Sequence, residues 1–141
     1  MALIAAFAVK LITRRDALQN ELRDLVMCCF LALVPVTTIA VGISAYPYAA
    51  PLGYALILIG VLGQLAFSMY RTAGLWRGTH TVAATTPVIY LPTVAANFAS
   101  ASGLGALGHH DWAMLFFGMG LLSWFSVEAA ILGRLRTEPA L

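Results

Sequence analysis

The chain has 141 residues, of which 61% are hydrophobic and only 10% are charged, whereas soluble domains carry about 25% charged residues. No Asp, Glu, Lys or Arg occurs from Leu25 to Tyr70 or from Gly78 to His110. Such runs are long enough to cross a bilayer, which takes about 20 apolar residues per helix. The composition excludes an ordinary soluble domain, and a net charge of +2 is too small to indicate a nucleic-acid partner. We therefore expect an all-α integral membrane protein surrounded by the lipid bilayer.

Residues 1–24 are predicted to lie outside the spanning region. Met1–Val9 is apolar but about half the length needed to cross; it reads either as the end of a helix whose beginning is missing or as an interfacial segment. It is not a convincing secretory signal, because Lys10 follows the apolar run instead of preceding it. Lys10–Asp24 is polar with a sparse leucine stripe at helical spacing. A short amphipathic helix on the membrane surface is the expected structure.

Four apolar segments follow, and we predict that residues 25–136 form four transmembrane helices with a polar tail at 137–141. The predicted spans are Leu25–Ala45, Leu52–Tyr70, Val88–Gly108 and Trp112–Gly133. A proline lies near the middle of the first span and in the first turns of the third. Proline removes a backbone donor and kinks a helix, so we expect these two spans to be kinked.

The basic residues predict the orientation. Four of the eight Lys and Arg precede the first span, two lie between the second and third, and two follow the fourth. The other two connections contain none. The positive-inside rule then predicts that both termini are cytoplasmic in a cell-membrane protein.

No pattern predicts an enzyme, a metal site or a cofactor. The cluster His109-His110-Asp111 is three consecutive residues on a turn, whose side chains point in different directions, so an exposed turn is favoured over metal ligation. The adjacent Cys28 and Cys29 could react with soft oxyanions, but a role as small hydrophobic residues within a helix is favoured. A membrane-embedded enzyme would need a catalytic constellation, and none is visible.

The prolines of the first and third spans and the neutral polar residues near them are the candidates for lining a pathway. They are Pro35, Thr37 and Thr38 in the first span and Pro92, Thr93 and Asn97 in the third. A pathway with hydroxyl and amide donors but no fixed charge suits anions bound weakly enough to leave. Equally, these side chains could only satisfy backbone groups freed by the kinks.

Glu128 is the one carboxylate well inside a predicted span. Carboxylates in a membrane are costly and often functional. Two alternatives remain open: a structural pairing with a neighbouring helix or a loop arginine, and a role in transport.

The stretch from Thr72 to Phe98 carries a resemblance to a known family. The matching words are TAGLWRG at 72–78, ATTP at 84–87, YLPTVA at 90–95 and Asn97-Phe98, continued by GALG at 105–108 and Ser123-Trp124. In these, and more weakly from about Ala5 onward, the chain resembles the family of tellurite-resistance TehA proteins, plant slow-type anion channels and fungal malic acid transporters.

That resemblance implies a fold of ten transmembrane helices in five hairpins, with five kinked inner helices around a pore, typically as a trimer. The four predicted spans resemble helices three to six of this fold, and the two proline-containing spans would be inner helices. The implied function is passage of small anions, oxyanions or C4-dicarboxylates by a fragment of such a channel. The alternative is a non-conducting membrane scaffold or assembly subunit that needs a partner chain carrying the missing helices.

Overall fold

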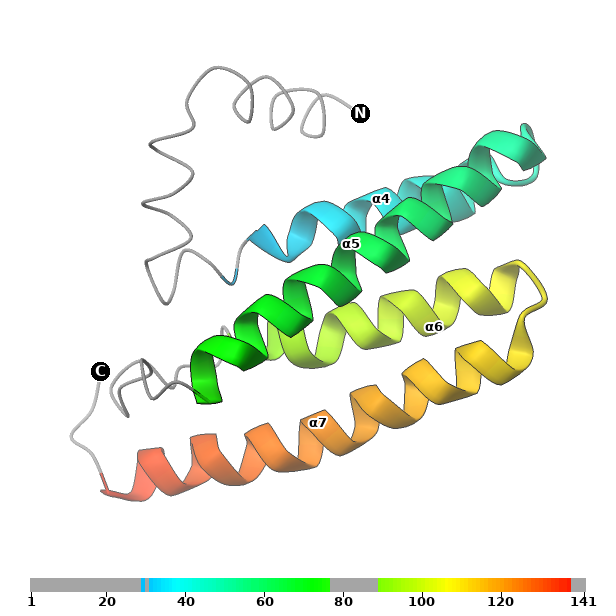
Figure 1. Cartoon of the computed structure of the whole chain (residues 1–141). Helices are drawn as coiled ribbons and strands as arrows, with labels where there is room; N and C mark the ends of the chain where they lie inside the picture. The colour runs from blue at the N-terminus through cyan, green and yellow to red at the C-terminus, as the bar shows by residue number, and fades with distance from the viewer. Residues whose placement is uncertain (1–28, 30, 77–88, 138–141) are drawn as a thin grey trace, which may run out of the picture.

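The computed structural model describes residue 29, residues 31–76 and residues 89–137, and of residues 71–76 it describes the backbone only. Within these ranges the chain is helical, as predicted, and forms two hairpins (Figure 1). The first hairpin consists of α4 (Leu33–Ala45) and α5 (Ala50–Trp76). The second consists of η3 (Leu91–Ala95), which continues directly into α6 (Ala96–Ala106), and of α7 (His110–Thr137). The short turns of both hairpins lie at the same end of the bundle (Figure 1).

The two turns follow from local sequence. Proline is tolerated in the first turn of a helix, and Pro51 is the second residue of α5. After α6, Gly108 adopts a φ of +81°, a backbone conformation that favours glycine. The His109 N–H donates to the Leu104 carbonyl at 2.9 Å and the Gly108 N–H to the Gly105 carbonyl at 3.0 Å. This pair of bonds is a Schellman motif, which ends α6 and starts α7 two residues later.

Glycines bring α4 and α5 close together. A Cβ atom on Gly60 would lie 2.5 Å from Ile39 Cγ1 and 2.9 Å from the Pro35 carbonyl oxygen. Gly42 lies in the same way against Ile57. Small residues at these crossings let membrane helices pack by van der Waals contact, since burial from water does not drive helix association in lipid.

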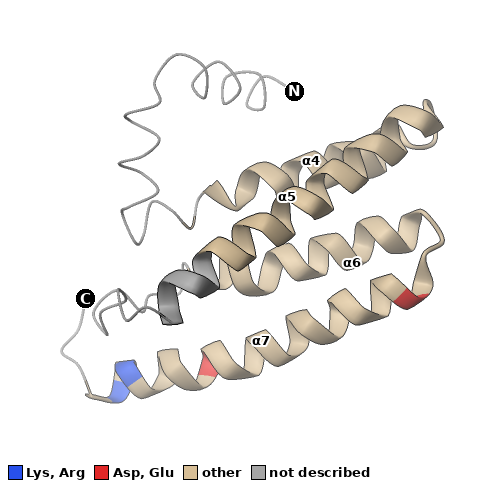
Figure 2. Cartoon of the chain, in the orientation of Figure 1, with Lys and Arg blue, Asp and Glu red and all other residues tan. Residues whose placement is uncertain are grey.

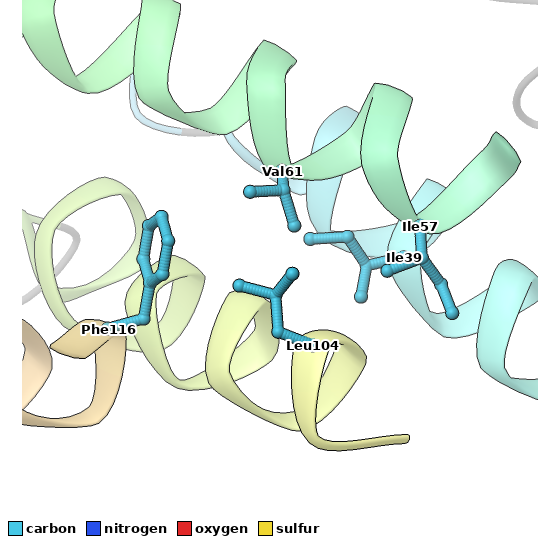
Figure 3. Packing of buried hydrophobic residues seen from close by; sticks show 5 residues of the cluster. All are labelled: Ile39, Ile57, Val61, Leu104 and Phe116. Carbon is cyan, nitrogen blue, oxygen red and sulfur yellow. The ribbon is translucent and has the colours of Figure 1, made fainter. Parts of the chain in front are cut away.

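The apolar core joins the two hairpins. Its buried members are Ile39 of α4, Ile57 and Val61 of α5, Leu104 of α6 and Phe116 of α7 (Figure 3). Helix α6 contacts the other three helices, so it holds the bundle together.

Pro35 and Pro92, the two prolines of the predicted kinks, both lie close to a point where a helix departs from regular geometry. Pro92 is the second residue of the π-helical turn η3, in which the Ala96 N–H donates to the Leu91 carbonyl. A π turn takes one extra residue and relieves the clash between a proline ring and the preceding turn. Pro35 is the third residue of α4, and Ala32 just before the helix is in a turn. Pro35 therefore lies in the first turn of α4. Most of the predicted range before Leu33 lies outside the described residues, so the position of Pro35 near the middle of the first span stays a prediction.

Of the charged side chains that the structure describes, three lie at the ends of α7 and Glu128 lies within this helix. Figure 2 shows acidic positions at the start of α7 and in its second half, and basic positions at its end; these are Asp111, Glu128, Arg134 and Arg136. Two helices, α5 over Ala50–Tyr70 and α7, are long and apolar enough to cross a membrane. They correspond to the second and fourth predicted spans, although α5 continues six residues beyond the predicted end. Residues 1–24, predicted to be a surface segment, lie outside the described residues.

Candidate functional site

The clearest buried polar contact joins α5 to the Pro92 turn. Gln64 is fully buried in α5, and its Nε2 donates to the Pro92 carbonyl at 3.1 Å and to Ser68 Oγ at 2.8 Å. The Ser68 hydroxyl also lies 3.4 Å from the same carbonyl. Gln64 Oε1 is buried without a hydrogen-bond partner among the described residues. The Gln64 amide thus fixes the π turn to α5 through a backbone oxygen at the irregular point of the third span.

Sequence reasoning missed Gln64 and Ser68. The available signal was that Gln64 is the one amide side chain between Leu52 and Tyr70, and intramembrane polar side chains usually face other protein segments. The partner could not be inferred, because a proline carbonyl 28 residues along the chain carries no sequence signature.

The pathway candidates bond to their own helices in this structure. Thr37 and Thr38 of α4 both donate to the Val34 carbonyl, at 2.9 and 2.8 Å. In the third span, Thr93 Oγ1 donates to the Ile89 carbonyl at 2.7 Å, and Asn97 donates to the carbonyl of Thr93, as described below. Thr37 is exposed, Thr38 and Thr93 are half-buried, and Pro35 is half-buried against α5. The structure therefore does not gather all six candidates around one opening, and a pore-lining role for them stays a prediction.

Asn97 is buried between α6 and α7. Its Nδ2 donates to the Thr93 carbonyl at 2.6 Å, and its exposed fraction is 7%. A Cβ atom on Gly120 of α7 would lie 3.3 Å from the Asn97 Cβ and 3.0 Å from the Phe98 ring. The missing side chain at Gly120 is what lets α7 approach this part of α6.

Glu128 of α7 is paired with neutral donors. Its Oε2 accepts hydrogen bonds from the Tyr90 hydroxyl, just before η3, and from Trp124 Nε1 at 3.2 Å, one turn earlier on α7. The sequence left a structural pairing and a transport role open for Glu128. The contact with Tyr90 corresponds to the structural pairing with a neighbouring helix. A transport role for the carboxylate stays a prediction.

The remaining candidates from the sequence are the histidine cluster and the two cysteines, and they do not form a metal site within the described ranges. His109, His110 and Asp111 are exposed at the α6–α7 connection, and His109 Nε2 lies 3.5 Å from the Tyr54 hydroxyl of α5. Among the described residues, no group of three His, Cys, Asp or Glu side chains could hold a metal ion. Cys29 is buried, and Cys28 lies outside the described residues.

Comparison with known proteins gives this arrangement its family. The profile of the SLAC1 family, described as "Voltage-dependent anion channel", matches residues 1–141. The chain is also similar to the "Tellurite resistance protein TehA homolog" of Haemophilus influenzae, with 42% identity over 134 residues, which is 94% of this chain and 41% of the relative. The chain thus spans about two fifths of the length of this relative. The match over the full chain, together with apolar helices interrupted at prolines, shows that the chain belongs to the SLAC1/TehA family of membrane anion channels, which are not enzymes.

Proposed function

We propose that this chain contributes kinked helices to a pore that passes small anions or oxyanions passively across the cell membrane. Tellurite is a candidate solute because the Haemophilus influenzae relative is described as a tellurite resistance protein. C4-dicarboxylates such as malate are candidates through the malic acid transporters of the resemblance. In this proposal the four helices cross the membrane with both termini in the cytoplasm, and the assembly is a homo-oligomer, by resemblance a trimer.

The observation that carries the proposal is the set of neutral hydroxyl side chains near Pro35 and Pro92. Thr37, Thr38 and Thr93 each donate to a carbonyl of their own helix, so an anion must displace one of these bonds to be coordinated. Such an exchange keeps binding weak, and conduction requires binding that is weak enough to release the ion.

Chloride and nitrate efflux from liposomes tests the proposal. Liposomes carrying the 141-residue chain are compared, by stopped flow, with empty vesicles and with liposomes carrying the chain joined to the remaining helices of its relative. Flux from the 141-residue chain would mean that copies assemble a complete pore. Flux only from the joined chain would assign conduction to the full set of helices. Absence of flux from both, with each shown to be inserted and helical, would refute the proposal.

A second candidate is a non-conducting scaffold or assembly subunit. Large apolar side chains on α5 and α7 are exposed in the described structure, among them Leu62, Met69 and Leu122, and these faces are available to other transmembrane segments. Isolation in a gentle detergent separates the candidates. A stable complex with another membrane protein would support the scaffold, and an isolated monomer without a partner would count against it.

A further inference from the structure

We propose that a groove between α5 and α7 binds one acyl chain of a phospholipid, with the lipid headgroup at the turn that joins α6 to α7. The groove is open along one side and has a volume of about 450 Å³. Its walls are Leu58, Val61 and Leu65 of α5 and Leu115, Phe116 and Met119 of α7. Leu104 of α6 is also part of the lining. This inference rests on the membrane location of the family and does not require the chain to conduct.

The dimensions favour an acyl chain over a helix. From His109 to Met119, both of which line the groove, the chain advances roughly 15 Å at the rise of an α-helix. One leaflet, half of a hydrocarbon core of about 30 Å, is also roughly 15 Å thick. A helix about 10 Å across would occupy roughly 1,200 Å³ over that length, well over twice the volume of the groove. A single hydrocarbon chain has the matching length and the smaller cross-section.

Polarity along the groove distinguishes its two ends. The lining is apolar except at the α6–α7 turn, where His109 and Trp112 contribute. The Tyr54 hydroxyl lies 3.5 Å from His109 Nε2, and the two rings meet edge to face with centroids 6.2 Å apart. Tyrosine and tryptophan favour the level of the lipid headgroups. A phosphate at this end can accept hydrogen bonds from the Tyr54 hydroxyl and the His109 ring, while the acyl chain follows the apolar walls.

Two phenylalanine substitutions on α5 test the proposal. Leu58 is half-buried in the groove wall, whereas Leu62, one turn later, is 65% exposed and outside the lining. The full chain is extracted in detergent, and dioleoylphosphatidylethanolamine is titrated while native mass spectrometry counts bound lipids. We expect one retained lipid on the wild type and on Leu62→Phe. Leu58→Phe should lower its affinity by about tenfold, the effect of displacing two buried methylenes. Circular dichroism checks that both variants are folded.

A fluorescence measurement locates the lipid. A chain that keeps only Trp112, through Trp76→Phe and Trp124→Phe, is compared with one that keeps only Trp124, in vesicles with a rising fraction of brominated phosphatidylcholine. Binding in the groove predicts quenching of Trp112 at a lower bromolipid fraction than Trp124. Three results would overturn the proposal: no retained lipid, equal loss in Leu58→Phe and Leu62→Phe, or a second copy of the chain in place of the lipid. Equal quenching of the two tryptophans would also do so.

Discussion

Gly60→Ala should separate α4 from α5 at one of their close approaches. A methyl group there would lie 2.5 Å from Ile39 Cγ1, 2.9 Å from the Pro35 carbonyl oxygen and 3.1 Å from the Ile39 backbone nitrogen. Two of these three atoms belong to the backbone, so a rotamer change cannot relieve the overlap. Overpacking costs about 1–3 kcal/mol or more, while alanine gains about 1 kcal/mol over glycine in a helix. Because two of the contacts are with backbone atoms, we take the upper end of this cost and expect the free energy of unfolding to fall by about 2 kcal/mol in total.

Gly63→Ala is the matched control on the same helix. The added methyl group would lie 3.6 Å from Pro35 Cβ, an ordinary van der Waals contact. Only the helix propensity then changes, and the free energy of unfolding should stay equal or rise by up to about 1 kcal/mol. The assay is unfolding of the chain in mixed micelles of rising SDS content, followed by circular dichroism. Equal stability of the two variants would refute the close approach of α4 and α5.

Four further predictions concern the polar contacts and the π turn. Gln64→Met removes two hydrogen bonds of about 0.6 kcal/mol each but also a buried carbonyl whose desolvation costs about 1–3 kcal/mol. Stability in the same assay should be unchanged or higher, and a loss above about 2 kcal/mol would mean that Oε1 has a partner. Glu128→Gln keeps an acceptor for Tyr90 and should be tolerated, whereas Glu128→Leu should cost about 1–2 kcal/mol; equal losses would assign the effect to the charge. Pro92→Ala restores a backbone N–H, and we expect the π turn to become regular α-helix, seen as a new protected amide in hydrogen exchange. Asn97→Ala removes the amide with little repacking, so a change in anion flux at unchanged stability would support a pore role, and a stability loss alone would assign Asn97 to the α6–α7 interface.

The helices could be predicted because their cause is local. Long uncharged runs and turn residues determine where a membrane helix can lie, and α5 and α7 agree with the predicted second and fourth spans. Helix α5 continues to Trp76, past the predicted span, whereas its stretch that is apolar enough to cross a membrane ends at Tyr70. An arginine at a helix end can reach the interface with its long side chain, so the first charge does not have to be the last helical residue.

The hydrogen-bond partners of the polar side chains could not be predicted from the sequence, because they depend on which helix faces are brought together. The proline-threonine pattern identified the irregular point of the third span correctly, and η3 contains Pro92 and Thr93. Each hydroxyl, however, had two acceptors available, a solute or the carbonyl of its own preceding turn, and both alternatives have the same sequence.

Gln64 shows how the π turn and the packing of α5 depend on each other. The π turn arises locally, because Pro92 cannot donate and its ring crowds the preceding turn. Its orientation is set by a distant residue, since the Pro92 carbonyl accepts from Gln64 Nε2 on α5. On the other side, Tyr90, two residues before Pro92, donates to Glu128 on α7. The start of the third span is thus held by one hydrogen bond to α5 and one to α7. We therefore predict that the geometry of the π turn depends on how α5 and α7 are placed on either side of it.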